Sequence, residues 1–486
     1  MQLQLSAGRV RGVEAAGVFA FTGLPYARAR RFELPRAVSW DGVLDANGWG
    51  PDAPQNPGES YQRSGVLQNE DCLRVNVWTP DVHGRRPVMF WIHGGAFYQG
   101  SSSLLSYDGA ELARRGDVVV VSINYRLGAL GFAHHPELAR EDGTSGNWAL
   151  FDQIEALRWV QREVAAFGGD PHNVTIFGES AGGSSVTLLM ASRLARGLFH
   201  KAICQSGSPG TFSKESVGTA TEQLAAELET TVSGLREVPL PALLKAARAV
   251  EQESSTGMVF LPVVDGSLIE KPPLEVFEAG QAAPVPLIMG TNADEYRLYA
   301  PRDPHSRKLE AEHLAHRVSA LVRAGTERII DTYRSERTAR GLGAANNELW
   351  FAIKTDERFR ARTRRVIDRH SKHQPTYHYL FRYGSPAMGG WLGAAHGIEI
   401  PFVFGTYRTE PVDRFAGTGP RADAMCERML HTWARFARSG NPSASDLAWP
   451  TYDAERKPTM VLDVESRIEH APAEREISTL EEYLIG

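Results

Sequence analysis

Short apolar runs rich in β-branched residues alternate along this chain with longer segments of helical periodicity. The runs at residues 87–92 and 117–123 are almost continuously apolar and bounded by turn residues, which is typical of strands buried on both faces of a parallel sheet. Comparable runs lie at residues 174–177, 201–204, 285–289, 376–383 and 459–462, with helical patterns at 147–164, 180–194 and 421–437. This alternation predicts an α/β fold, with a central, mostly parallel, twisted sheet and helices on both faces.

Two further segments, about residues 213–261 and 302–359, have helical composition and few strand signals. We expect them to be helical insertions that cap the carboxyl edge of the sheet within one domain spanning residues 1–486. Length alone would favour about three domains of about 150 residues, but large α/β proteins commonly exceed that size. The sequence contains no internal repeat or low-complexity tract that would argue for separate domains.

Composition restricts the partners and the compartment. A formal net charge of −5 provides no bulk attraction to nucleic acid or anionic membranes, and no apolar stretch approaches the roughly 18 residues that span a bilayer. The three cysteines cannot form a disulfide framework and lack a metal-binding spacing, while residues 1–6 lack the features of a signal peptide. We expect a cytoplasmic monomer or weak homo-oligomer with no nucleic-acid or membrane partner.

The segment Gly178-Glu179-Ser180-Ala181-Gly182 fits the G-x-S-x-G pattern of a nucleophile elbow. In such an elbow a serine lies on a tight strand-to-helix turn, where bulky residues two positions away would clash, and the helix directs its positive end toward developing negative charge. The pattern alone is weakly specific in a chain with 46 glycines. The apolar strand before it and the helical segment after it favour Ser180 as a nucleophile over a bystander serine in a glycine turn.

A second glycine loop supplies candidate donors for a developing oxyanion. His93-Gly94-Gly95-Ala96-Phe97 directly follows the run at 87–92, and unhindered amides in such a loop can stabilise a tetrahedral intermediate. We predict that the N–H groups of Gly94, Gly95 and Ala181 form the oxyanion hole. The loss of one such donor typically costs about 3–4 kcal/mol of transition-state stabilisation.

A serine nucleophile needs a base, which in this arrangement follows the serine in the chain. His396 is the favoured candidate because it lies in a loop of small residues after the run at 376–383. The residues themselves leave three alternatives open, and two other candidates are excluded because they precede the serine. The alternatives are His200, His373 and His378, and the two excluded by chain order are His134 and His135.

The base in turn needs an acid that orients it. Asp294 and Glu295 both follow the run at 285–289, and their position alone does not choose between them.

Taken together, these motifs resemble the type-B carboxylesterase/cholinesterase family, in particular its bacterial para-nitrobenzyl esterase-like members. The resemblance extends in order along nearly the whole chain. The matching segments are 21–26, 70–78, 93–97, 124–128, 167–171, 178–183, 262–266, 290–295, 396–404 and 449–452.

The resemblance implies an α/β-hydrolase fold and a serine carboxylesterase that cleaves esters by two-step acyl transfer, with no metal or other cofactor. It implies that Glu295 rather than Asp294 is the acid and that His396 is the base. The alternatives are the same machinery tuned to amides, lactones or a specialised natural-product ester. A non-catalytic binding scaffold is disfavoured because all three triad positions are present.

The resemblance also implies two buried scaffold ion pairs, Arg31 with Glu70 and Arg126 with Asp152. Two departures from the family pattern stand out. Tyr296 replaces the usual glycine after the acid, and Asn56 replaces the cysteine that often pairs with the position of Cys72. The unpaired Cys72 supports the expectation of an intracellular protein. The sequence between residues 56 and 72 contains no tryptophan, so a choline ester is not the favoured substrate.

An esterase pocket is expected to be largely apolar, and six aromatic residues are candidates to line it. Ordinary core packing is the competing interpretation for each of them. They are Phe97, Tyr98, Trp148, Trp350, Phe351 and Phe404.

Overall fold

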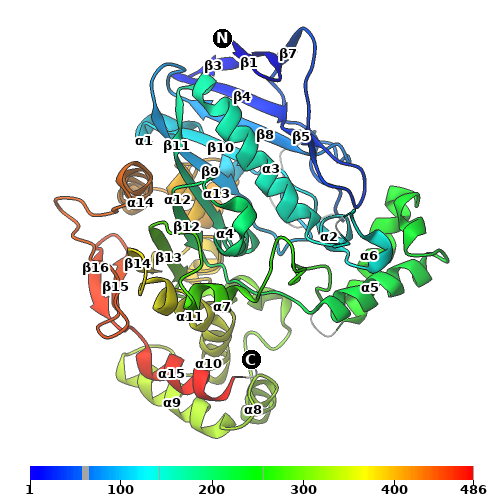
Figure 1. Cartoon of the computed structure of the whole chain (residues 1–486). Coiled ribbons are helices and arrows are strands. Elements are labelled where there is room, and N and C mark those ends of the chain that lie inside the picture. Colours follow the sequence, from blue (N-terminus) through cyan, green and yellow to red (C-terminus); the bar gives the residue numbers. More distant parts are fainter. Residues whose placement is uncertain (57–64, 142, 255–256, 485–486) are drawn as a thin grey trace.

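A computed structural model describes residues 1–56, 65–141, 143–254 and 257–484. Its centre is an eleven-stranded sheet that is parallel from β10 to β15 and antiparallel at both edges (Figure 1). The strands are, in spatial order, β16 (Arg467–His470), β15 (Pro458–Leu462), β14 (Thr376–Phe381), β13 (Leu287–Asn292), β12 (Lys201–Gln205), β11 (Gly169–Glu179), β9 (Arg86–Ile92), β10 (Val119–Ile123), β8 (Arg74–Thr79), β4 (Val18–Pro25) and β3 (Val13–Ala15).

Smaller strand groups lie in the first 45 residues. A three-stranded sheet contains β1 (Gln2–Leu5), β2 (Gly8–Arg11) and β7 (Val43–Asp45), and a two-stranded one contains β5 (Ala27–Arg28) and β6 (Arg36–Ala37).

The two faces of the sheet are covered by different helices. One face packs against α3 (Trp148–Glu163), α4 (Ala181–Ala191), α7 (Pro273–Glu278) and α11 (Ala361–His370). The other packs against α1 (Ala110–Gly116), α12 (Ile400–Phe404) and α14 (Pro420–Ser439). Short helices α2 (Gly128–Phe132) and α13 (Val412–Ala416) lie in connections.

Strand β9 illustrates why the central strands appear in the sequence as continuous apolar runs. Val88, Phe90 and Ile92 belong to the core on the α3 side, whereas Met89 and Trp91 belong to the core on the α14 side. Because successive side chains of a strand point to opposite faces, burial of both faces leaves no polar position. The mostly parallel sheet with helices packed on both faces confirms the predicted α/β-hydrolase fold.

One strand is displaced from its predicted range. The run at 285–289 predicted a strand that begins before Pro286, but β13 spans Leu287–Asn292. Proline has no N–H to donate to the ladder, so the hydrogen-bonded strand begins after it.

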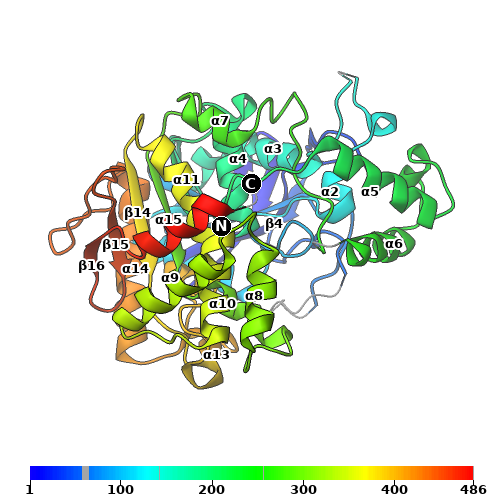
Figure 2. The same ribbon diagram turned by 90° about the horizontal axis from the view of Figure 1, so that it is seen from below.

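The segments between the late strands are mostly helical. Helices α5 (Lys214–Glu227) and α6 (Leu240–Glu253) lie to one side of the sheet, while α8 (Ala311–Ser319), α9 (Thr326–Ala339), α10 (Asn346–Thr355) and α15 (Glu474–Tyr483) form a separate group around their own apolar cluster (Figures 1 and 2). In the described residues no helix combines the length and apolarity that crossing a membrane requires.

The parallel register brings the predicted motifs to one edge of the sheet. Ile92 of β9 pairs with Gly178 of β11, Glu179 pairs with Gln205 of β12, and Gln205 pairs with Gly290 of β13. The chain leaves these strands into the loops at 93–97, 180–182, 206–211 and 293–299. In open α/β sheets the crevice outside the carboxyl ends of the strands is the usual ligand site.

Candidate active site

Ser180 lies at a sharp bend between β11 and α4. Its backbone has φ 57° and ψ −121°, a conformation that residues other than glycine rarely adopt. The N–H of Ser180 donates to the carbonyl of Gln205 at 2.9 Å, and the N–H of Ser184 donates to the carbonyl of Ser180 at 2.8 Å, so the bend is held from both sides. Backbone strain of this kind persists where the surrounding structure enforces it, and it concentrates at functional sites.

The glycines of the elbow permit close packing against the end of β9. A Cβ atom added to Gly182 would collide with the carbonyl oxygen of Ile92. A Cβ atom added to Gly94 would lie 2.8 Å from the carbonyl oxygen of Glu179 and 3.1 Å from Cβ of Ser180. The loop after β9 therefore lies directly against the serine.

The three amides predicted for the oxyanion hole remain available as donors. Among the described residues, no backbone or side-chain acceptor takes the N–H of Gly94, Gly95 or Ala181. Ala181 is the first residue of α4, where N–H groups have no partner within the helix, and Gly94 borders Ser180 from the opposite side.

His396 meets Glu295 in a buried cluster at this edge. Nδ1 of His396 donates to Oε2 of Glu295 at 2.6 Å, and Glu295 is fully buried. The other carboxylate oxygen of Glu295 accepts from the hydroxyl of Ser206 at 2.6 Å and from the N–H of Asn292 at 2.7 Å. The acid is thus fixed by donors from the ends of β12 and β13.

Asp294 has a different environment. Its carboxylate accepts from the N–H of Ala394 at 3.0 Å and lies 3.3 Å from Nε of Arg297. It joins the loop after β13 to the loop that carries His396, and Glu295 is the member of the pair that contacts the imidazole.

The three alternative histidines occupy other places. His378 lies within β14, where Nδ1 is 3.0 Å from the hydroxyl of Thr459 and burial lowers the pKa of the ring to about 3. His200 accepts from the N–H of Val174, in the first half of β11 and away from the elbow. The ring of His373 packs beside Gly280.

Glu179 is a buried carboxylate whose importance the pattern analysis missed. Its Oε1 lies 3.0 Å from Nε2 of His396. Burial raises the pKa of Glu179 to about 8. Burial alone would lower the pKa of His396, but the carboxylates of Glu179 and Glu295 outweigh it and raise that pKa to about 9. The signal in the sequence was the carboxylate at the variable position directly before Ser180.

Within the described residues, Nε2 of His396 makes no hydrogen bond to the Ser180 hydroxyl, and the carboxylate of Glu179 lies 3.0 Å from it. Catalytic hydrogen bonds are often long in ligand-free enzymes and tighten when substrate binds. The ring of His396 is confined meanwhile by Phe359 and Tyr299, whose ring centroids lie 4.8 and 5.7 Å from it.

Phe359 reaches the imidazole from an irregular turn. Residues Asp356–Arg360 form a π-helical turn between α10 and α11, and Arg360 donates to the carbonyl of Ala293, two residues before Glu295. Single π turns in helices are frequent at functional sites. No sequence pattern marks this turn.

A third buried carboxylate, Glu399, supports the same edge. It accepts from the side-chain amides of Asn292 at 2.6 Å and Gln205 at 3.0 Å, and burial raises its pKa. Its place three residues after His396 was the available signal in the sequence.

The predicted aromatic lining requires correction. Trp148 and Phe404 are completely buried. Trp148 donates to the carbonyl of Ala133, and Phe404 packs on Trp91 in the core beneath α12, so both act in core packing. Their burial follows from their place on core-facing helices.

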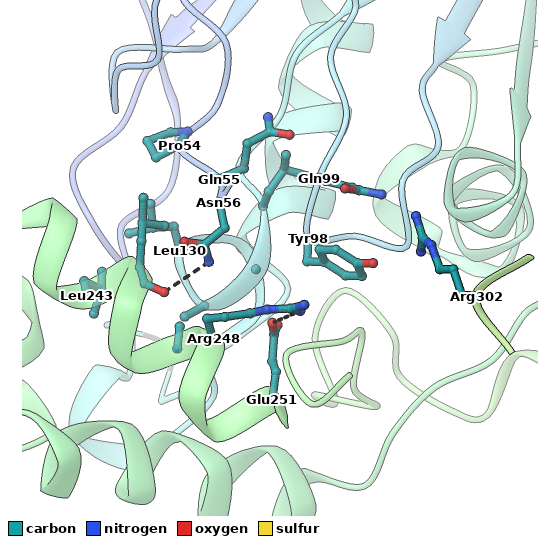
Figure 3. A pocket seen from close by; sticks show the side chains of 15 residues that line it. Pro54, Gln55, Asn56, Tyr98, Gln99, Leu130, Leu243, Arg248, Glu251 and Arg302 are labelled. Carbon is teal, nitrogen blue, oxygen red and sulfur yellow. Dashed lines mark hydrogen bonds and ion pairs between the residues drawn. The ribbon is translucent and has the colours of Figure 1, made fainter. Parts of the chain in front are cut away.

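The other aromatic candidates lie nearer the loops of the site. Phe97 is buried and packs edge-on against Phe132 of α2. Trp350 and Phe351, on α10, pack against Tyr296, the residue that replaces the expected glycine. Tyr98 is the candidate that lines a cavity of about 320 Å³ beside the site (Figure 3).

Both implied scaffold ion pairs are present. Arg126 makes two hydrogen bonds to the buried carboxylate of Asp152, at 2.7 and 2.8 Å. Arg31 makes two to Glu70, both at 2.6 Å, but the side chain of Glu70 is only partly buried. The described residues contain no cluster of His, Cys, Asp or Glu suited to a metal ion.

Comparisons with known proteins agree with this architecture. The model of the carboxylesterase family matches residues 1–480. The para-nitrobenzyl esterase of Bacillus subtilis is 37% identical, covering 96% of this chain and 95% of its own length, and the phenmedipham hydrolase of Pseudarthrobacter oxydans is 34% identical, covering 94% of each. A solved carboxylesterase of Geobacillus stearothermophilus superposes with a TM-score of 0.88 at 37% identity, covering 99% of each chain. This chain belongs to the carboxylesterase family and is a serine hydrolase of carboxylic esters.

Proposed function

We propose that Ser180, His396 and Glu295 act as a Ser-His-Glu triad that hydrolyses carboxylic esters by two-step acyl transfer. The position of the His396 ring carries the proposal. Nδ1 donates to Glu295 at 2.6 Å, and Nε2 lies 3.0 Å from Glu179, the residue directly before Ser180. A ring held in this way directs Nε2 toward the elbow, as a general base for Ser180 requires.

In the first step Nε2 of His396 takes the hydroxyl proton of Ser180 while the serine oxygen attacks the ester carbonyl carbon. Glu295 keeps the hydrogen on Nδ1 and stabilises the imidazolium that forms. The imidazolium then protonates the leaving alkoxide. Water attacks the acyl-enzyme with the same assistance, which releases the acid and restores Ser180.

The N–H groups of Gly94, Gly95 and Ala181 stabilise the negative charge on the former carbonyl oxygen in both steps. The support is that each of them lacks a protein acceptor in the described part of the chain and that two of them border Ser180. The mechanism uses only protein groups and water, and we propose that it needs no cofactor.

We further propose that residues 1–486 work as one catalytic domain with helical insertions at about 213–261 and 302–359. A cytoplasmic location is supported by Cys72, Cys204 and Cys426, which are buried free thiols of the kind that a reducing compartment preserves. We propose a monomer or weak homo-oligomer, to be measured by light scattering.

A fluorophosphonate probe tests the nucleophile directly, because the activated serine oxygen displaces its fluoride and forms a stable phosphonate ester. We expect wild-type protein to be labelled at Ser180, as located by mass spectrometry of peptides, and to release a burst of p-nitrophenol from p-nitrophenyl acetate. Ser180→Ala should lose the label and lower kcat at least about a thousandfold, because the triad acts as a unit.

Ser184→Ala is the matched control. Ser184 lies one turn along α4, and its hydroxyl accepts from the N–H of Ser208. This variant should keep the label and the burst, and both variants should unfold at the wild-type temperature. Near-native turnover by Ser180→Ala would overturn the proposal. Rates on matched p-nitrophenyl esters, p-nitroanilides and lactones then separate ester hydrolysis from the related alternatives.

A further inference from the structure

The cavity beside the oxyanion loop contains a buried carboxylate that the proposed mechanism does not use. Helix α6 forms one wall of this cavity, and the loop after β9 and the segment 127–130 form others (Figure 3). The residues that line it are Pro54, Gln55, Asn56, Tyr98, Gln99, Leu127, Gly128, Ala129, Leu130, Leu243, Leu244, Ala247, Arg248, Glu251 and Arg302.

The cavity adjoins the candidate active site through a single tight turn. The N–H groups of Tyr98 and Gln99 donate to the carbonyl of Gly95 at 3.2 and 3.0 Å, and the N–H of Gly128 donates to the carbonyl of Phe97 at 2.8 Å. The loop that offers amides to the ester carbonyl therefore also forms the cavity wall. A group bound here can belong to the same molecule as an ester at Ser180.

Glu251 is the buried charged group of this cavity. The residue is 5% exposed, and its carboxylate lies 3.8 Å from Nη1 of Arg248. Among the described residues no donor makes a hydrogen bond to this carboxylate. Buried carboxylates nearly always have hydrogen-bond donors, because their desolvation is otherwise costly. Burial raises the pKa of Glu251 to about 7.

Arg248 compensates the carboxylate only weakly. Its side chain is 46% exposed, so water screens its charge, whereas the side chain of Glu251 is 7% exposed. Figure 3 shows both side chains extending from α6 into the region below the ring of Tyr98. The carboxylate is the more deeply buried of the two.

The other residues that line the cavity indicate what kind of molecule could bring a hydrogen-bond donor to Glu251. Leu127, Leu130, Leu243 and Ala247 supply apolar surface. The charged groups of the described lining are the carboxylate of Glu251 and the guanidinium groups of Arg248 and Arg302, of which Arg302 lies beside the ring of Tyr98 and away from Glu251 (Figure 3). This combination suits a hydrocarbon chain or ring that ends in a protonated amine. Such a group would make charge-assisted hydrogen bonds to the carboxylate.

We propose that this cavity is a substrate subsite that binds the amine-bearing end of an ester, with the ammonium group at the carboxylate of Glu251. This inference rests on the proposed function and extends it to a class of substrate, esters with a cationic amine on the acyl or the alcohol part.

Matched substrates test the charge preference. Acetate esters of 4-(aminomethyl)benzyl, 4-ethylbenzyl and 4-carboxybenzyl alcohol place a cation, a neutral group or an anion at the same distance from the ester. Benzyl 6-aminohexanoate and benzyl heptanoate place the cation or a neutral end on the acyl part instead. For wild-type protein we expect kcat/KM for the amine ester to exceed that of its neutral partner at least about tenfold in one of the two series.

Glu251→Gln removes the charge while preserving the shape of the side chain, and Glu253→Gln makes the same change at an exposed position on α6. The preference should disappear in Glu251→Gln and persist in Glu253→Gln, and hydrolysis of the neutral esters should be unchanged in Glu253→Gln. An unchanged preference in Glu251→Gln, equal rates for amine and neutral esters in wild type, or a preference for the carboxylate would overturn the proposal.

A measurement on wild-type protein keeps the proposal testable if Glu251→Gln does not fold. An aliphatic amine stays protonated between pH 6 and 8, while Glu251 ionises over that range. The ratio of amine to neutral rates should therefore rise several-fold with pH, and a flat ratio would contradict the subsite. If the neutral esters are still hydrolysed in a reaction that depends on Ser180, the proposed function stands even when the subsite proposal fails.

Discussion

The carboxylate of Glu179 lies 3.0 Å from Nε2 of His396, on the opposite side of the ring from Glu295, which accepts from Nδ1 at 2.6 Å. The imidazole is therefore flanked by two buried carboxylates. Both favour its protonated form and outweigh the effect of burial, which favours the neutral form. The carboxylates that position the imidazole therefore also raise the pH at which it loses its proton.

Glu179→Gln should move the acidic limb of the kcat/KM pH profile to lower pH by about one to two pH units. The reason is that His396 must be neutral to accept a proton, and its pKa of about 9 depends on nearby negative charge. The measurement is kcat/KM for a neutral ester from pH 5 to 10. Glu399→Gln is the comparison, since Glu399 accepts from Gln205 and Asn292 and has the smallest effect of the three carboxylates that raise the pKa of His396. Equal shifts in both variants would show that Glu179 has no special effect.

Glu295→Gln should reduce kcat by about a thousandfold to ten-thousandfold, because an amide neither enforces the required tautomer nor stabilises the imidazolium. Asp294→Asn should cost less than about tenfold, since Asp294 joins two loops and does not contact the ring. Steady-state kinetics on p-nitrophenyl acetate distinguishes the two. The reverse order of effects would reassign the acid to Asp294.

Gly94→Ala should lower kcat about a hundredfold to a thousandfold by displacing one oxyanion donor. The added Cβ would lie 2.8 Å from the carbonyl oxygen of Glu179 and 3.1 Å from Cβ of Ser180, so the loop must shift. Gly48→Ala is the matched control, because a Cβ there meets no atom within 4 Å. If both variants retain wild-type kcat, the Gly94 amide does not stabilise the oxyanion.

Asp152→Asn should destabilise the fold by about 3–5 kcal/mol, because it leaves the buried guanidinium of Arg126 without its counter-charge. The exposed pair between Glu410 and Arg414 provides a comparison, and Glu410→Gln should have little effect. Denaturant unfolding of both variants measures the difference. A loss in Asp152→Asn no larger than in Glu410→Gln would show that the buried pair adds little to stability.

Local sequence patterns were sufficient to predict an element where a single physical requirement acts on consecutive residues. The run at 87–92 predicted β9 because burial of both faces excludes polar residues from every position. The elbow was predictable because a strained serine turn between a strand and a helix excludes bulky residues two positions away, and Ser180 has that backbone conformation. The run at 285–289 was less accurate because apolar character does not reveal that Pro286 cannot join the ladder.

The sequence by itself determined the order of the catalytic motifs along the chain, the elbow at Ser180 and the family to which the motifs belong. The residues themselves left Asp294 and Glu295 open, the resemblance favoured Glu295, and the tertiary structure shows that Glu295 contacts His396. Only the tertiary structure decided that Glu179 lies at the other ring nitrogen and that Trp148 and Phe404 are core residues. The physical reason is distance along the chain. A periodic pattern reports burial and local conformation, whereas the contact between residues 295 and 396 depends on how parallel strands align their ends.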